Sequence, residues 1–169
     1  MATINLSAYN KTKIPSAKAF RFGIVVSQWN DDITQNLYQG AVETLVNCGA
    51  YKKNIITWSV PGSFELVYAS KKMVKTQLLD AVIVIGCLIK GETEHFNYVC
   101  QGIIKGIADL NILYDTPVIF CVLTDSNKEQ SVNRSGGKLG NKGVECALAA
   151  VKMATLQDDV NELNERWLN

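Results

Sequence analysis

The segment Ala81-Val-Ile-Val-Ile-Gly-Cys-Leu-Ile-Lys-Gly-Glu-Thr-Glu-His95 decides the fold of this chain. Its first five residues, 81–85, are all apolar, which predicts a strand buried on both faces. The glycines at 86 and 91 predict a turn, and residues 92–94 then open a predicted helix that carries His95, the only histidine. A strand, a glycine turn and a helix start expose backbone N–H groups at one point, where they can bind an anion. The segment therefore predicts a site for a small phosphorylated substrate, with a proton-transfer group beside it.

Strand-like and helix-like segments alternate along the chain from residue 20 onward. Short apolar runs predict further strands at 22–27, 55–60 and 117–123. Apolar residues at helical spacing predict helices from 31 or 32 to Gly49, through 66–73, from 92 to about 110, over 128–134 and from about 141. This alternation is typical of βαβ units. We expect an α/β fold, a single-domain three-layer α/β/α sandwich whose four-stranded parallel sheet carries helices on both faces.

The first residues differ in composition from the rest of the chain. They are polar and contain Pro15, which predicts an extended N-terminal arm over 1–19 and one α/β domain over 20–169. A chain of 169 residues is large enough for one domain with its own core. A content of 47% hydrophobic and 20% charged residues is typical of a soluble globular protein.

Charge and cysteine content argue against several classes of protein. The net charge is +1 and the charges are mixed along the chain, so we expect neither nucleic acid nor a membrane surface as a partner. Neither a signal peptide nor a membrane-spanning apolar stretch is evident, which predicts a cytoplasmic protein. The five cysteines are widely spaced and odd in number, so we expect buried thiols rather than disulfides or a metal site.

Ligands of parallel α/β sheets bind beyond the carboxyl ends of the strands, so polar and aromatic residues there are the candidates for a site. Trp29 follows the first strand, where its ring could stack on a heterocycle or simply pack over the sheet edge. Glu65 follows the second strand. Its carboxylate could accept hydrogen bonds from a ligand or face solvent in the first turn of a helix.

Three further features could bind or process a phosphorylated substrate. The turn at 91–93 offers backbone N–H groups but lacks the pattern of a dinucleotide or triphosphate loop. His95 could transfer protons near neutral pH or be a surface or structural residue. Arg134 could clamp a phosphate or end its helix in solvent. One histidine and isolated cysteines argue against zinc catalysis, and we expect no metal or cofactor.

Five motifs together resemble the 6,7-dimethyl-8-ribityllumazine synthase family of riboflavin biosynthesis. They are 28–30 (QWN), 60–66 (VPGSFEL), 86–99 (GCLIKGETEHFNYV), 117–120 (PVIF) and 134–143 (RSGGKLGNKG). The similarity spans about residues 20 to 156 in the family's order and spacing. It implies a flavodoxin-like fold and a transferase that condenses 5-amino-6-(D-ribitylamino)uracil with 3,4-dihydroxy-2-butanone 4-phosphate, releasing phosphate and water.

The resemblance also implies a role for each candidate residue. Trp29 would stack on the pyrimidine, and His95 would transfer protons. The ribityl chain and ring would be bound by Ser63, Phe64, Glu65 and the backbone of Cys87, Leu88 and Ile89. The butanone phosphate would be held by backbone N–H groups of Glu92 and Thr93, with Arg134 as its cationic partner. Glu92 stands where the family often has a small residue, which puts a carboxylate near the phosphate unless its side chain points outward.

Family sites lie between the subunits of a pentamer, which implies a homopentamer in which Phe120 and Arg134 reach the neighbouring subunit's site. The compact turn at 136–141 resembles members that build icosahedral shells, so we expect a 60-subunit assembly. Two other functions fit the same fold. A flavodoxin-like module would bind a flavin or another phosphorylated ligand without turnover, and a purely structural shell protein would need no site residues.

Overall fold

A four-stranded parallel sheet forms the centre of the protein. The computed structural model describes residues 7–9 and 13–168. The strands are β1 (Phe22–Ser27), β2 (Ile55–Val60), β3 (Ala81–Ile89) and β4 (Val118–Asp125). They lie in the order β2-β1-β3-β4, and every neighbouring pair is parallel. The predicted parallel sheet is confirmed, and its strand order is that of flavodoxin-like folds.

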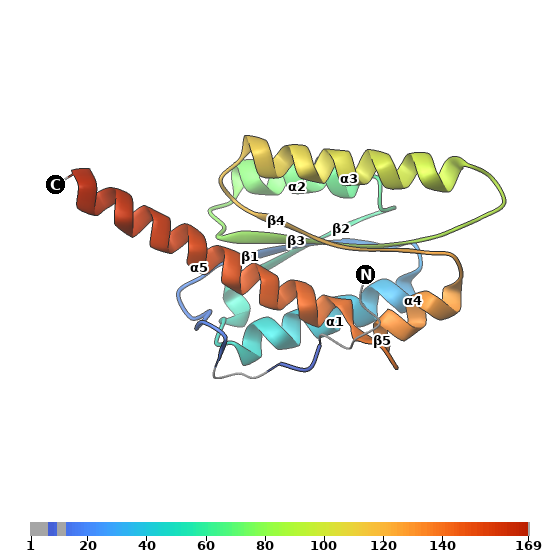
Figure 1. The fold of residues 1–169 in the computed structure, drawn as a ribbon, viewed down its shortest axis with the longest axis horizontal. Coiled ribbons are helices and arrows are strands. Elements are labelled where there is room, and N and C mark those ends of the chain that lie inside the picture. The colour runs from blue at the N-terminus through green and yellow to red at the C-terminus, as the bar shows by residue number, and fades with distance from the viewer. Residues whose placement is uncertain (1–6, 10–12, 169) are drawn as a thin grey trace.

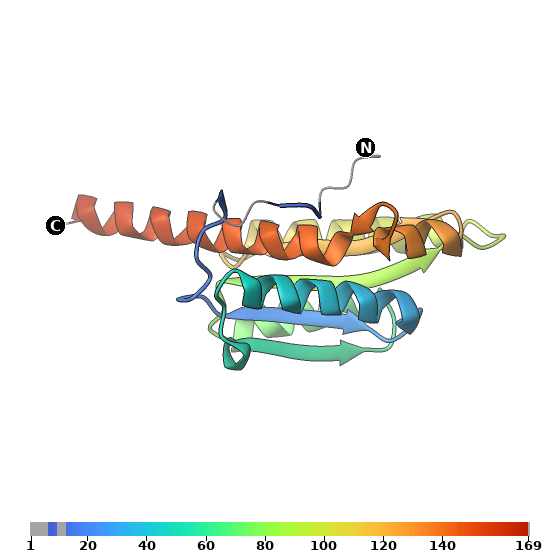
Figure 2. The ribbon, with the colours of Figure 1, turned by 90° about the horizontal axis from the view of Figure 1, so that it is seen from below.

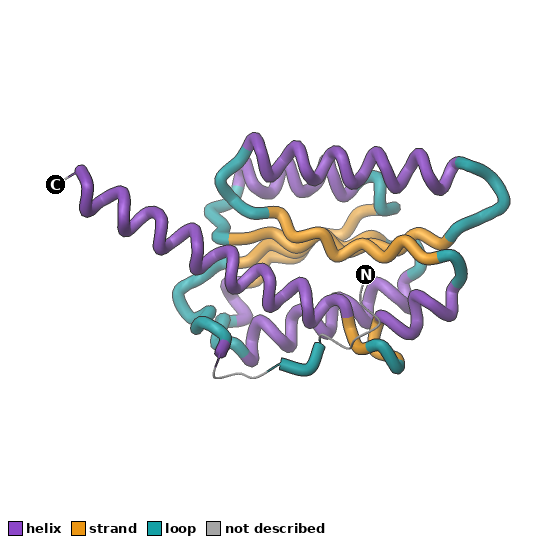
Figure 3. Tube along the Cα trace, in the orientation of Figure 1, coloured by secondary structure: helices purple, strands orange, loops and turns teal. Residues whose placement is uncertain are grey.

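Helices cover both faces of the sheet (Figure 1). One face carries α2 (Leu66–Thr76) and α3 (His95–Leu113), and the other carries α1 (Asp31–Asn47), α4 (Lys128–Arg134) and α5 (Lys142–Leu168). Figure 3 shows the same three layers by secondary structure, which confirms the predicted α/β/α sandwich. The smaller elements are the 3-10 helix η2 (Lys52–Asn54) and the antiparallel pair β5 (Ser135–Gly137) and β6 (Gly140–Asn141). In the described part of the chain, none of the helices is long and apolar enough to cross a membrane.

The core consists of two apolar clusters, one on each face of the sheet. Ile83 and Ile85 of β3 point toward α1 and α5, whereas Val82 and Val84 point toward α2 and α3, and all four are fully buried. Each such side chain contributes about 1.5–3 kcal/mol by leaving water. The prediction of a strand buried on both faces is confirmed, and it fixes β3 at the centre of the fold.

The carboxyl ends of the strands meet at one edge of the sheet (Figure 2), where two predicted boundaries are wrong. β3 continues to Ile89 instead of ending at 85, because β4 pairs with it as far as Asp125. Gly86 is therefore a strand residue and not a turn residue. α3 begins at His95, so residues 92–94 form a loop before the helix instead of its first turn.

The predicted N-terminal arm lies partly outside the described residues, since 1–6 and 10–12 are not described. Where it is described, it contacts the domain. The Ser7 hydroxyl accepts a hydrogen bond from the Asn141 N–H at 2.6 Å, and Ala17 is buried with its N–H bonded to the Cys48 carbonyl at 2.8 Å. The division of the chain at residue 19 stays a prediction.

Candidate active site

A pocket of about 640 Å³ opens at the carboxyl edge of the sheet. This volume is typical of sites for small molecules. Its walls come from the loops after β1 and β2, the end of β3 and the start of α3. They consist of Trp29, Asn30, Ser63, Phe64, Glu65, Cys87, Leu88, Ile89, Gly91, Thr93, His95, Phe96 and Val99. Most of the predicted site residues therefore meet in one cavity. Glu92, Phe120 and Arg134 are not among the residues that line it.

Trp29, Gly62 and Glu65 form one packed unit on one side of the pocket. The Trp29 ring lies so close to Gly62 that a Cβ there would come within 2.6 Å of it. Trp29 as a whole is still 67% exposed, so it packs over the sheet edge and also leaves surface open to a ligand. The Gly62 N–H donates to Glu65 Oε2 at 2.9 Å, which holds the half-buried carboxylate at the pocket wall instead of in solvent.

Asn30 is a wall residue to which sequence reasoning gave no role. Its φ of 57° lies in the left-handed region, which asparagine adopts more readily than most residues. Its Nδ2 donates to the Cys87 carbonyl at 3.0 Å and so links the loop after β1 to the end of β3. The tolerance of asparagine for this conformation, three residues after the end of a predicted strand, was the available signal.

The end of β3 presents a free backbone edge to the pocket. β1 pairs with β3 only as far as Ile85, whereas β4 pairs with it to Ile89. The backbone of 87–89 therefore has a strand neighbour on one side only, and on the other side Asn30 bonds the Cys87 carbonyl. The Cys87 side chain belongs to the cluster on the α1/α5 face.

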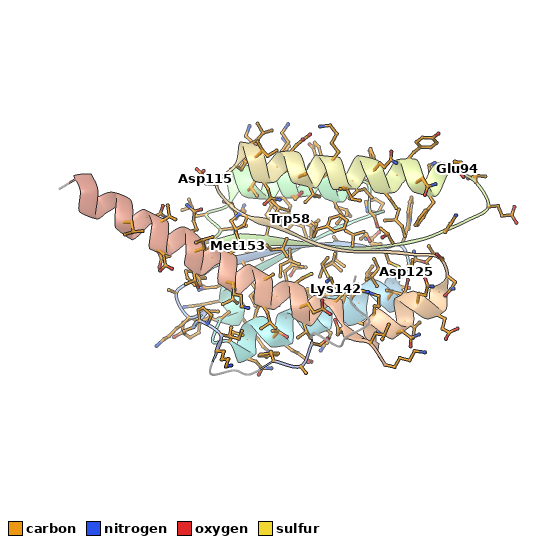
Figure 4. The ribbon with its side chains drawn as sticks, viewed as in Figure 1. Trp58, Glu94, Asp115, Asp125, Lys142 and Met153 are labelled. Carbon is orange, nitrogen blue, oxygen red and sulfur yellow. The ribbon has the colours of Figure 1, made fainter. Side chains whose placement is uncertain are left out.

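The amino-terminal end of α3 lies at the opposite wall, close to the labelled Glu94 in Figure 4. His95 is the first residue of this 19-residue helix, is exposed and lines the pocket. No side chain caps the helix at Glu94. The first N–H groups of a helix lack partners inside it, and the helix dipole makes this end positive. This wall is suited to an anion.

Arg134 and Phe120 lie away from this pocket in the single chain. Arg134 ends α4, on the face of the sheet opposite to α2 and α3. Phe120 is a half-buried residue of β4, the outer strand of the sheet. Neither lines the pocket with His95. A single chain therefore does not bring all of the predicted residues together.

A buried hydrogen-bond chain lies behind the pocket, on the α4 side. The Cys87 thiol donates to Ser131 Oγ at 3.5 Å, and the Ser131 hydroxyl donates to Asp125 Oδ2 at 2.7 Å. Burial raises the pKa of the Cys87 thiol, and the nearby Asp125 carboxylate raises it further, so the thiol stays protonated near neutral pH. Cys87 thus serves there as a hydrogen-bond donor to Ser131.

The fold and the pocket together define an open-sheet α/β protein with a pocket at the carboxyl ends of the strands, where such folds bind their ligands. The family model described as 6,7-dimethyl-8-ribityllumazine synthase matches residues 19–158. The chain belongs to this family, as its motifs predicted, and is an enzyme.

Several bacterial relatives carry the same name. The protein of Flavobacterium psychrophilum is 61% identical over 95% of this chain and 85% of its own length. That of Flavobacterium johnsoniae is 60% identical over 93% of this chain and 83% of its own, and that of Christiangramia forsetii is 58% identical over 92% and 93%. The family model thus covers residues 19–158, and each of these relatives aligns with more than nine-tenths of the chain.

Proposed function

We propose that this enzyme condenses 5-amino-6-(D-ribitylamino)uracil with 3,4-dihydroxy-2-butanone 4-phosphate in the pocket at the sheet edge, releasing phosphate and water. One observation carries the proposal. The exposed ring of Trp29, the oriented carboxylate of Glu65 and His95 at the uncapped start of α3 line a single cavity. A flat heterocycle and a phosphate are the ligands that these two walls suit.

The ribitylaminouracil occupies the wall formed by the ends of β1, β2 and β3. Trp29 stacks on the pyrimidine, and Ser63, Phe64 and Glu65 bind the ring and the ribityl chain. The Gly62 N–H occupies Glu65 Oε2, which leaves Oε1 to accept from substrate hydroxyl or amide groups. The free backbone edge of Cys87, Leu88 and Ile89 supplies further polar groups, as the β3 pairing supports.

The butanone phosphate occupies the wall at the start of α3. Backbone N–H groups of Glu92 and Thr93 hold the phosphate next to the positive end of the helix. Thr93 lines the pocket, whereas Glu92 is exposed and does not line it. Gly91 and Thr93 line the pocket on either side of Glu92, so the backbone between them lies next to the cavity, and the proposal does not need the Glu92 carboxylate there.

The reaction then needs placement of two reactants and movement of protons. The substrate amine attacks the ketone and loses one water to form an imine, phosphate leaves by elimination, and the ring closes with loss of a second water. Orientation of the two substrates in one pocket supplies much of the acceleration. His95 transfers protons between the two halves, which contributes about 10²–10⁴-fold in typical cases.

The site is completed by a second subunit of a homopentamer. Phe120 and Arg134 of one subunit reach the pocket of its neighbour, with Arg134 as the cationic partner of the phosphate. Phe120 and Arg134 do not line the pocket of their own chain, which supports a site shared between two subunits. The β5–β6 turn is compact, as in the family members that build shells, and this resemblance supports assembly of pentamers into a 60-subunit shell. Four buried free thiols, those of Cys87, Cys100, Cys121 and Cys146, support a reducing, cytoplasmic location.

Turnover with the two substrates tests the proposal directly. We expect lumazine absorbance and phosphate to appear together in equal amounts, and His95→Ala to slow turnover but leave residual activity. Lys105→Ala is the matched control, because Lys105 lies on the same helix with its side chain 76% exposed in an ion pair with Asp109. Wild-type-like turnover of His95→Ala would remove His95 from the mechanism. Bound flavin without turnover would favour a binding module instead, and light scattering distinguishes a pentamer from a shell.

A further inference from the structure

The helix that carries Arg134 depends on tertiary contacts for its position. α4 has seven residues, fewer than an isolated helix needs to be stable in water. Its amino-terminal end is capped locally, since Asn127 Oδ1 accepts from the Gln130 N–H at 3.0 Å and Gln130 Oε1 accepts from the Ser126 N–H at 2.9 Å. These bonds hold the start of the helix. Arg134 lies at its other end.

Ser131 joins the later part of α4 to the sheet. It is the one residue of α4 that is buried, and it is fully buried. Its hydroxyl donates to Asp125, the last residue of β4, and accepts from Cys87 of β3. Asp125 lies beside α4 in Figure 4. One hydroxyl therefore links a helix and two strand ends.

The positions of Ser131 and Arg134 in α4 connect the Ser131 hydrogen bonds to the Arg134 guanidinium. Ser131 and Arg134 are three residues apart in the helix, so they lie on neighbouring turns of nearly the same face. The Cys87 backbone does not depend on the link, because it is held independently by its pairing with Leu123 and by Asn30. Loss of the Ser131 hydroxyl should therefore move α4 and leave the pocket wall of β3 in place.

We propose that Ser131 is a positioning residue for phosphate binding. By bonding Asp125 and Cys87, it fixes α4 on the ends of β3 and β4 and so sets the position of the Arg134 guanidinium. This inference rests on the proposed function, in which Arg134 binds the butanone phosphate in the neighbouring subunit's pocket. Other elements form the wall that binds ribitylaminouracil, so Ser131 has no effect on the binding of that substrate.

Ser131→Ala in the full-length assembled enzyme tests the role. Alanine is a good helix former of similar size, so the change removes both hydrogen bonds and leaves the helix itself intact. We expect the KM for butanone phosphate to rise by about tenfold, the equivalent of one to two ordinary hydrogen bonds, and the KM for ribitylaminouracil to stay the same. Ser131→Cys, which keeps a weak donor and acceptor, should recover part of the loss.

Lys128→Ala is the matched control on the same helix. Lys128 also ties α4 to a neighbouring element, through an ion pair with Asp32 at 2.7 Å, but the two side chains are 64% and 50% exposed. Exposed ion pairs contribute little. We therefore expect both KM values of Lys128→Ala to equal those of the wild type. An increase as large as that of Ser131→Ala would overturn the specific role of Ser131.

A double-mutant cycle separates positioning from general structure. In the Arg134→Ala background, Ser131→Ala should cause no further rise in the KM for butanone phosphate, because the guanidinium it positions is gone. A further rise, or an equal loss for both substrates, would overturn the inference. An Arg134→Ala enzyme with unchanged KM would instead refute the role of Arg134 in the proposed function. If Ser131→Ala fails to assemble, the same double-mutant cycle is measured with Ser131→Cys. The KM for butanone phosphate should then rise by less, and this rise must again disappear in the Arg134→Ala background.

Discussion

Gly86 and Gly91 flank the segment that forms the pocket wall of β3, yet the structure gives them opposite tolerance for a methyl group. At Gly86, a Cβ would lie 2.6 Å from Ser63 Oγ and 2.9 Å from Leu66 Cδ1. At Gly91, a Cβ would have no heavy atom within 4 Å, and φ there is not in the left-handed region. We predict that Gly86→Ala destabilises the protein and that Gly91→Ala does not.

The size of the effect follows from these distances. Ordinary Cβ contacts begin at 3.4 Å, so Ser63 and the fully buried Leu66 must both move by several tenths of an ångström. Overpacking of this kind costs about 1–3 kcal/mol. In a chain of this length each kcal/mol lowers Tm by about 2–4 °C. Gly91→Ala should leave the free energy of unfolding unchanged or raise it by up to about 1 kcal/mol, because alanine restricts the unfolded chain.

Denaturant titration and calorimetry at one fixed protein concentration measure both variants, since assembly makes Tm depend on concentration. Gly86→Ala should also raise the KM for ribitylaminouracil, because the displaced Ser63 side chain lines the pocket. Wild-type stability of Gly86→Ala, or an equal loss for Gly91→Ala, would refute the reasoning from close contact.

Three smaller predictions concern single polar groups. Ser27 Oγ is buried and has no hydrogen-bond partner in the described structure, so Ser27→Ala should keep or raise the free energy of unfolding; a loss above about 1 kcal/mol would contradict this. Cys87 should react with iodoacetamide more slowly than the half-exposed Cys48 near neutral pH, because burial raises the pKa of its thiol, and equal labelling by mass spectrometry would argue against it. A hydrogen bond from Lys128 lowers the pKa of Asp32. A lowered carboxyl pKa adds stability that is complete above the unfolded pKa and is lost as the pH falls through the folded pKa. The small stability deficit of Asp32→Asn should therefore be present at neutral pH, shrink as the pH falls below about 4 and vanish below the lowered pKa of Asp32; a deficit that persists in strong acid would contradict the assignment.

Much of the site could be predicted because its residues follow strands that are recognisable from local pattern. Trp29, Glu65 and His95 each lie in the segment that joins a predicted strand to the next helix or at the start of that helix, and parallel strands bring their carboxyl ends to one edge. Asn30 was missed as a wall residue because its contact with Cys87 joins a loop to a strand end far away in the sequence. The link from Cys87 through Ser131 to Asp125 had no local pattern at all, since its members come from three different elements.

The sequence by itself determined the class of fold, because apolar runs and helical spacing are local properties that report burial directly. Its motifs also determined the family. Only the tertiary structure decided where β3 ends, because the length of a strand is set by its neighbour β4 and not by its own apolar run. It also decided that Gly86 serves close packing and that Arg134 lies apart from the pocket of its own chain. The end of β3, the close packing at Gly86 and the location of Arg134 all depend on distances between segments that are remote in the sequence, and the spacing of residues along the chain does not report such distances.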